Sequence, residues 1–310
     1  MKVFVAGASG AIGRPLVPQL LAAGHEVTGM TRREERADTI RAAGADAVVC
    51  DALDADALRD AVVAAQPEVV VHELTALPAR IDFKGDPFGS TTRLRIEGTR
   101  NLVAAAKAAG ARRLIAESFA SLYAPEGSWV KDEDAPLFLD APAPFDNAVA
   151  GIVDLERQVL GAEGIEGVVL RYGWFYGPGT YFGRDGSQAE DTIKRRSPVV
   201  GKGAGTFSFI HIEDAAAATA AAIEHGAPGV YNIADDEPAA QRDWLPVYAE
   251  ALGAKKPLRV PVWIARLIAG GAAASMATEL RGVSNAKAKR ELGWQPAHPS
   301  WRQGFAESLA

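Results

Sequence analysis

Glycines at every third position follow a short apolar run at the start of the chain. Residues 2–6 have the length and composition of a strand buried on both faces, and apolar residues at helical spacing begin at Ile12. Glycines between a strand and a helix let the backbone bend sharply and approach a ligand closely, while the free N–H groups at the helix start favour negative charge. The pattern therefore predicts a binding site for the pyrophosphate group of a dinucleotide. Its predicted residues are Gly7, Ser9, Gly10, Ala11, Ile12 and Gly13.

A second set of residues bears on which dinucleotide is bound. The expected strand 27–30 is followed by Thr31, Arg32 and Arg33. In dinucleotide-binding folds an acidic residue here binds the ribose 2′-hydroxyl of NAD, whereas cations suit the 2′-phosphate of NADP. An arginine matches a phosphate dianion in geometry and charge, so NADP(H) is favoured over NAD(H). The alternative is that both arginines belong to the solvated first turn of the next helix.

The elements that must position these residues alternate between strand and helix. Such alternation predicts an α/β fold with a Rossmann-type, doubly wound parallel sheet. The expected strands are 2–6, 27–30, 47–50, 68–72, 113–116 and 167–170, and the expected helices include 91–109 and 149–160.

Composition narrows the class of protein. The 310 residues are 48% hydrophobic and carry a net charge of −6 without a basic block, which argues against a nucleic-acid partner. One cysteine fits a reducing, cytoplasmic location. The apolar stretch 264–274 is interrupted by Arg266 and two glycines, so we expect a packed helix there and no membrane partner. The histidines lack metal-ligand spacing, so no metal is expected.

The spacing GxxGxxG, rather than GxGxxG, resembles the short-chain dehydrogenase/reductase superfamily, and later segments resemble its extended branch. Residues 171–179 are similar to its "LRP…YGPG" segment, 207–214 to "FVHVDD", and 291–296 to its ending "LGW.P". The resemblance implies further cofactor contacts from Asp51, Ala52, Leu53, Leu74, Thr75, Ala76, Ser118 and Tyr172. By itself, Asp51 could equally cap the helix that follows it.

The resemblance also implies a division of the chain. An NADP-binding Rossmann domain would span 1–171 and be completed by about 208–233. A smaller substrate-binding region would comprise 172–207 and 234–310. A homodimer through the helices 91–109 and 149–160 is implied as well.

The superfamily's proton-transfer residues are absent near their expected positions. The Tyr-x-x-x-Lys pair would fall at about Ala148 and Ile152, the Ser/Thr at Phe119 and the Asn at Arg95. The chain therefore resembles the atypical, epimerase/dehydratase-like extended branch, and another group must supply any proton. The catalytic candidates are Tyr123, Ser118, Tyr176 and Arg95, and the candidates for substrate contact are Phe119, Tyr123, Trp174, Phe175 and Tyr181.

Each candidate has a plainer alternative. The tyrosines and the serine could be wall residues of a cleft, because a tyrosine with a pKa near ten needs a neighbouring cation to act at neutral pH. Arg95 could supply that cation or bind an acidic substrate, or it could form a helix-surface ion pair with Glu97 or a neighbouring acid.

These observations predict an NADP(H)-dependent oxidoreductase acting on the carbonyl or alcohol of a small organic substrate. Two alternatives remain. Phe119 and Ile152 could fill the space over the nicotinamide, which would leave a non-catalytic NADP-binding sensor. The protein could also be a non-redox epimerase or lyase that keeps NADP as a structural cofactor.

Overall fold

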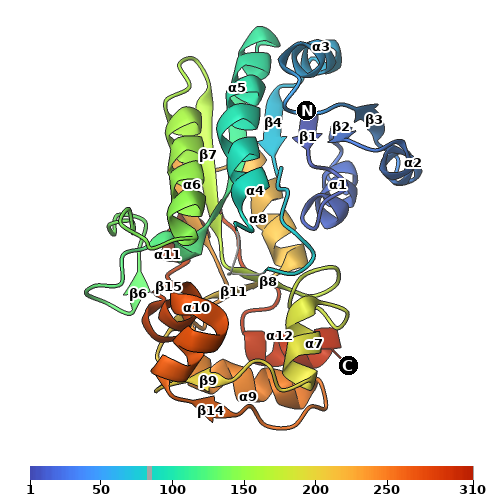
Figure 1. The fold of residues 1–310 in the computed structure, drawn as a ribbon. Helices are drawn as coiled ribbons and strands as arrows, with labels where there is room; N and C mark the ends of the chain where they lie inside the picture. Colours follow the sequence, from blue (N-terminus) through green and yellow to red (C-terminus); the bar gives the residue numbers. More distant parts are fainter. Residues whose placement is uncertain (82–85, 310) are drawn as a thin grey trace.

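A computed structural model describes residues 1–81 and 86–309. Within these ranges the first part of the chain forms a seven-stranded sheet in the order β12-β7-β5-β4-β1-β2-β3, and every neighbouring pair is parallel (Figure 1). The predicted Rossmann-type α/β fold is confirmed. The strands are β1 (Lys2–Ala6), β2 (Glu26–Thr31), β3 (Asp46–Val49), β4 (Val69–His72), β5 (Arg113–Phe119), β7 (Glu166–Tyr172) and β12 (Gly229–Ile233).

Helices cover both faces of the sheet because successive side chains of each strand point to opposite faces. Val3 and Val5 of β1 pack in one core with α1 and α8, whereas Phe4 and Ala6 pack in a second core with α3, α5 and α6. The helices are α1 (Gly13–Ala22), α2 (Glu34–Ala42), α3 (Ala55–Ala65), α5 (Thr99–Ala108), α6 (Phe145–Leu160), α8 (Ile212–Glu224) and α11 (Ala286–Glu291).

The helix expected over 91–109 is present, but it changes type along its length. It begins as α4 (Gly89–Arg93), continues as a π-helical turn over Leu94–Gly98, and ends as α5. Such wide turns are rare inside helices and frequently mark functional sites. Arg95 lies in this turn and is buried.

A smaller region lies beyond the carboxyl ends of the sheet strands, in the lower half of Figure 1. Its core is aromatic and includes Tyr176, Phe209, Trp244, Tyr248 and Phe305. Its elements are β8 (Trp174–Tyr176), α7 (Ser187–Ile193), β9 (Val199–Val200), β10 (Thr206–Phe207), β11 (Phe209–His211), β13 (Ala239–Ala240), α9 (Gln241–Ala251), β14 (Arg259–Val260), α10 (Val262–Glu279), β15 (Gly282–Val283), which pairs with β6 (Val130–Lys131), and α12 (Trp301–Leu309).

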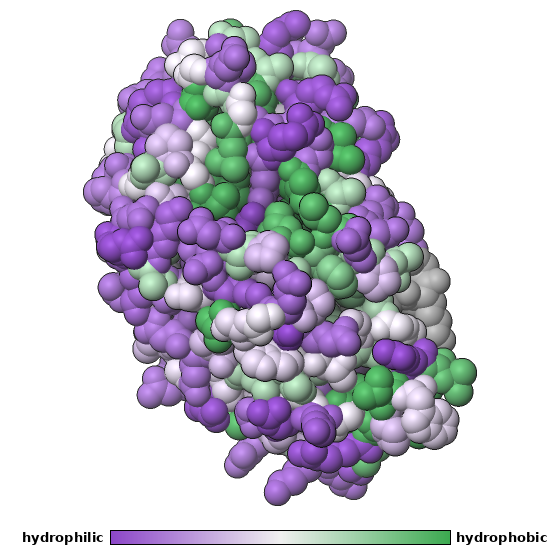
Figure 2. Space-filling model, turned by 90° about the vertical axis from the view of Figure 1, so that its left-hand side faces the viewer, coloured by the Kyte–Doolittle hydropathy of each residue, from purple (hydrophilic) through white to green (hydrophobic). Residues whose placement is uncertain are grey.

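The expectation of a packed helix over 264–274 is only partly correct. The helix is present as α10, but Trp263, Leu267 and Ile268 are 67%, 79% and 65% exposed. The first half of the helix packs against the protein through the small residue Ala265, which leaves its large apolar side chains in solvent. Gly270, with φ of +90°, then interrupts the helix. In Figure 1, α10 lies at the front of the lower half. The front of that view becomes the right-hand side of Figure 2, and an apolar patch lies low on that edge. Among the described residues, no helix is long and apolar enough to cross a membrane.

Candidate functional site

The glycine turn between β1 and α1 leaves no room for side chains. Gly7 has a φ of +95°, and a Cβ atom on it would lie 2.5 Å from the backbone oxygen of Glu73. A Cβ atom on Gly13 would lie 2.5 Å from the backbone of Ala8, so the helix can pack tightly against the end of the strand only with glycine there. Gly10 lines a deep cavity, as do the next two residues. The turn therefore fits the close approach of a dinucleotide pyrophosphate at a helix start.

The predicted cofactor residues at the end of β2 lie beside this turn. The Ser9 hydroxyl is 3.0 Å from the Thr31 hydroxyl, which ties the turn to the strand end. Arg32 and Arg33 are exposed on the rim of a shallow surface hollow that residues 34–36 complete. Neither guanidinium forms an ion pair with another described residue, so both are open to an anion.

The ends of β3 and β4 are followed by the predicted cofactor residues at positions 51–53 and 74–76. Asp54 caps α3 by accepting a hydrogen bond from the backbone N–H of Ala57 at 3.1 Å, whereas Asp51 accepts from the N–H of Leu53 at 3.0 Å. Asp51 is thus not the helix cap. The carbonyl of Ala52 accepts a hydrogen bond from the Asn101 side chain.

After β4 the chain is held in an extended course by side chains. The Leu74 N–H donates to Nδ1 of His72, and the Ala76 N–H donates to the Thr91 hydroxyl, while Thr75 lines the cavity. The Nε2 atom of His72 is 2.9 Å from the Thr99 hydroxyl. Complete burial, helped by the charge of Arg95, lowers the pKa of His72 to about 4, so its ring is neutral.

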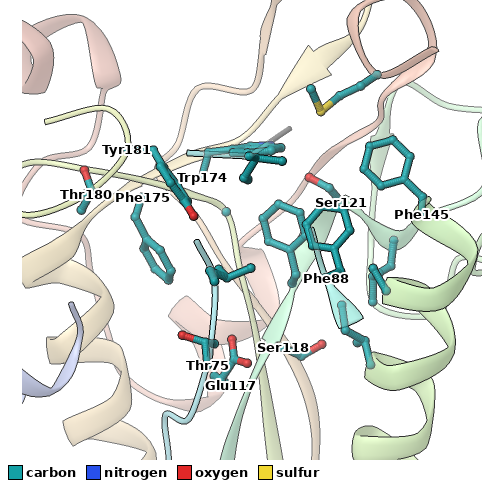
Figure 3. Close-up of a pocket in the computed structure, with 18 of the residues that line it drawn as sticks. Thr75, Phe88, Glu117, Ser118, Ser121, Phe145, Trp174, Phe175, Thr180 and Tyr181 are labelled. Carbon is teal, nitrogen blue, oxygen red and sulfur yellow. The ribbon is translucent and has the colours of Figure 1, made fainter. Parts of the chain in front are cut away.

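The cavity has a volume of about 620 Å³ and lies between the ends of β4, β5 and β7 and the smaller region. Figure 3 shows its polar floor, formed by Thr75, Glu117 and Ser118. Aromatic side chains surround the space above this floor: Phe88, Phe119, Phe145, Trp174, Phe175 and Tyr181. All five residues predicted from the sequence for substrate contact therefore line the cavity, namely four of these aromatic residues and Tyr123.

A buried ion pair anchors the floor of the cavity. Arg95 reaches Oε1 of Glu117 with Nε at 3.2 Å and Nη2 at 2.9 Å, and both side chains are only 7% exposed. The alternative pairing with Glu97 is wrong, because Glu97 pairs with Arg93 at 3.1 Å on the surface. Both contacts of the guanidinium go to one carboxylate oxygen, so Oε2 of Glu117 is left for a ligand.

A second buried carboxyl group, that of Glu73, also lines the cavity. Its Oε1 accepts a hydrogen bond from the Tyr172 hydroxyl at 3.2 Å, and its Oε2 is enclosed without a partner among the described residues. Burial and the nearby charge of Glu117 raise the pKa of Glu73 well above its ordinary value. Tyr172 is fully buried beneath this floor, 2.7 Å from the Thr219 hydroxyl.

The hydroxyl groups of Ser118 and Tyr123 are engaged in a buried network. Ser118 donates to Oε1 of Glu156 at 2.6 Å, and Arg171 holds the same carboxylate with contacts of 2.8 and 2.6 Å. Tyr123 donates to the Asn232 side chain at 2.7 Å and accepts from Arg171 at 2.9 Å. Burial outweighs the neighbouring cation and raises the pKa of Tyr123, so its proton is held tightly.

The hydroxyl groups of Tyr176 and Tyr181 are buried or hydrogen-bonded within the protein. Tyr176 is not among the described residues that line the cavity; it is fully buried with its ring 5.2 Å from that of Phe305. Burial raises its pKa. Tyr181 lines the cavity, but its hydroxyl donates to the carbonyl of Pro78.

The wall formed by α6 is apolar. Ala148, Val149 and Ile152 face the cavity, and Phe119 of β5 packs against the apolar cluster that contains Val149 and Ile152. Sequence reasoning identified this change of residue type, but it missed Glu117 and Glu73. Their only sequence signal is a charged residue inside or directly after an apolar strand run, where an unpaired charge would be costly.

A glycine turn at a helix start, strand ends that meet at one sheet edge and an adjoining cavity define a dinucleotide-binding α/β enzyme. Comparisons with known proteins agree with this class. The sequence profile of the NAD-dependent epimerase/dehydratase family matches residues 3–234, and the chain belongs to this family.

One relative bears on the chemistry, and two solved structures share the fold. A "3-diazoavenalumate denitrifying reductase" from a Streptomyces species is 48% identical over 98% of this chain and 99% of its own. A Thermus thermophilus UDP-glucose 4-epimerase solved with NAD has a TM-score of 0.75 at 23% identity, covering 100% of this chain and 98% of its own. A human epimerase family protein solved with NADPH has a TM-score of 0.76 at 23% identity, covering 100% and 99%. The protein is an oxidoreductase of the short-chain dehydrogenase/reductase superfamily that uses a nicotinamide cofactor.

Proposed function

We propose that the protein is an NADPH-dependent reductase that replaces the diazo group of a small aromatic substrate with hydrogen. One observation carries this proposal: the wall of the cavity on α6, where the superfamily keeps its tyrosine and lysine, consists of Ala148, Val149 and Ile152. Such an apolar wall fits a hydride acceptor whose reduction needs no proton from a side chain of the protein.

The chemistry of an aryl diazonium group meets that requirement. The cofactor supplies a hydride. A new C–H bond forms with the electron pair of the hydride, and the C–N bond breaks with its pair leaving on N₂. The cofactor is oxidised, the aryl group is reduced, and no proton is transferred. The name of the Streptomyces relative, which states a diazo substrate, loss of nitrogen and reduction, supports the transfer of this chemistry to a chain 48% identical.

The cavity supplies the matching binding groups. Aromatic walls, among them Phe119, Trp174 and Phe175, suit a planar ring. Oε2 of Glu117 offers a negative oxygen to a cationic diazonium group, while Arg95 fixes the carboxylate from its other side.

The carbonyl or alcohol substrate predicted from the sequence stays a prediction. Reduction of a carbonyl group needs a proton on its oxygen. The hydroxyl protons of Ser118 and Tyr123 are already directed to Glu156 and Asn232, which disfavours their use on a substrate.

For the cofactor we propose NADP(H) rather than NAD(H). The support is the pair of exposed guanidinium groups of Arg32 and Arg33 at the end of β2, next to the Thr31 hydroxyl. Because the two structural neighbours were solved with NAD in one case and NADPH in the other, the preference for NADP(H) rests on the two arginines.

The test is a pair of assays with matched acceptors on one aromatic ring. With NADPH, an aryl diazonium salt should oxidise the cofactor and release N₂ in equal amounts, whereas the corresponding aryl ketone should not. Turnover of the ketone alone would favour the carbonyl reductase. A sensor would bind NADPH without oxidising it with either acceptor, and a lyase would convert its substrate at constant cofactor absorbance.

A further inference from the structure

The first half of α10 and the segment before it form an exposed surface unlike the rest of the molecule. Its apolar side chains are large and open to solvent: Leu258 is 47% exposed, Trp263 67%, Leu267 79% and Ile268 65%. Surface leucines standing singly are ordinary, but four such side chains within eleven residues need an explanation. We call residues 255–269 the α10 surface.

The charges of the α10 surface have one sign. Lys255, Lys256, Arg259 and Arg266 are all exposed, and the sequence has no acidic residue between Glu250 and Glu279. None of the four cations forms an ion pair with another residue of the described ranges. The α10 surface is therefore locally cationic in a chain whose net charge is −6.

Neighbouring elements add to the positive charge. The Arg195 side chain, after α7, donates a hydrogen bond to the carbonyl of Lys256 at 3.3 Å. Lys202 follows Gly201, whose Cβ position lies 2.8 Å from the Val262 side chain at the start of α10. Both added cations are exposed. The apolar side chains are therefore bordered by lysine and arginine from three parts of the chain.

We propose, in contrast to the expectation of no membrane partner from the sequence, that the α10 surface docks the protein onto an anionic lipid membrane. Exposed tryptophan, leucine and isoleucine side chains at the start of a helix, bordered by lysine and arginine from the preceding and neighbouring segments, are suited to binding at a membrane interface. The apolar side chains would enter the headgroup boundary and the cations would pair with lipid phosphates. Self-association through the same face would bring two sets of unpaired cations together, which disfavours a second copy as the occupant.

This docking would place the cavity rim near the lipid. Beyond the break at Gly270, the second half of α10 contributes Ser275, Met276 and Glu279 to the cavity. A substrate with an apolar tail would then have a short path from the membrane to the cavity.

The test is flotation of the full chain with two kinds of vesicle, phosphatidylcholine alone and phosphatidylcholine mixed with phosphatidylglycerol. We expect binding to the anionic vesicles only, and loss of that binding at high salt. The variant L267S/I268S and the variant K255E/R259E should each reduce the bound fraction at least tenfold. All four positions are exposed, so folding is checked simply by circular dichroism.

Matched controls come from elsewhere on the surface. Leu139 is 65% exposed, as is Ile268, and L139S should leave binding unchanged. Arg100 is an exposed cation on α5, and R100E should likewise have no effect. Three outcomes would overturn the proposal: no binding to either vesicle, equal binding to both, or a change in molecular mass by light scattering for L267S/I268S, which would make this surface an interface between copies.

Discussion

Removing the carboxylate of Glu117 should be one of the most damaging single changes to this fold. In Glu117→Ala the guanidinium of Arg95 stays buried, 7% exposed, without its partner. Breaking a buried ion pair in this way costs about 3–5 kcal/mol, because the remaining charge is neither solvated nor paired. Urea unfolding of the cofactor-free protein at pH 7 measures this loss.

The same helical stretch provides the control. Arg93 and Glu97 form an ion pair of similar length, but their side chains are 61% and 45% exposed. Glu97→Ala should therefore cause little or no loss of stability. If Glu117→Ala were no more destabilising than Glu97→Ala, Arg95 would be solvated in solution and the floor described here would be wrong.

A double variant separates stability from function. Arg95→Met combined with Glu117→Leu replaces both charges with apolar groups of similar volume, which is often neutral or stabilising for a buried pair. Most of the lost stability should return. Reduction of a cationic aryl diazonium salt should stay at least tenfold slower in kcat/KM, because the negative oxygen above the floor is gone. Full recovery of the rate would show that Glu117 has only a structural role.

Three further results are expected. Arg32→Ala/Arg33→Ala should weaken NADPH binding by roughly 10- to 100-fold in calorimetry while leaving NADH binding unchanged, since this is the loss expected for one charged hydrogen bond to a phosphate of about 1.5–3 kcal/mol; an equal loss for both cofactors would argue against the 2′-phosphate site. The raised pKa of Glu73 means that the folded state keeps a proton that the unfolded state releases, so wild-type stability should fall as the pH rises above about 4.5. In urea unfolding at pH 5 and pH 8, Glu73→Gln should remove that fall, and an unchanged slope would contradict the assignment. Gly13→Ala should weaken NADPH binding at least tenfold because its Cβ would lie 2.5 Å from the Ala8 carbonyl, whereas Gly271→Ala, with open space around it, should not.

Local patterns predicted the fold well, whereas the cofactor-binding residues stay a prediction. The glycine turn, the short buried strands and the helix between them depend on residues close in sequence, so strand and helix positions followed from the chain itself. From the resemblance, the sequence places the positions of the superfamily's tyrosine and lysine at about Ala148 and Ile152, and both of these apolar residues line the cavity.

Partners distant in sequence were beyond such reasoning. Arg95 pairs with Glu117, 22 positions away, because a π-helical turn and a neighbouring strand bring the two together. Ser118 and Tyr123 were catalytic candidates from the sequence, but Glu156, Arg171 and Asn232 occupy their hydroxyl groups. The exposure of α10 was missed for a similar reason: periodicity reports an apolar helix but does not report whether anything covers it.

The central claim is that the cavity passes a hydride from NADPH to the carbon of an aryl diazonium group. The most direct measurement is a reaction with NADPH deuterated at C4, in each of its two stereochemical forms, followed by mass spectrometry and NMR of the arene. One of the two forms should place one deuterium at the carbon that lost N₂, with one NADPH oxidised per N₂ released and only a slow background without protein. Hydride transfer from NADPH would be refuted if the arene lacked deuterium with both stereochemical forms, or if N₂ were released without oxidation of the cofactor.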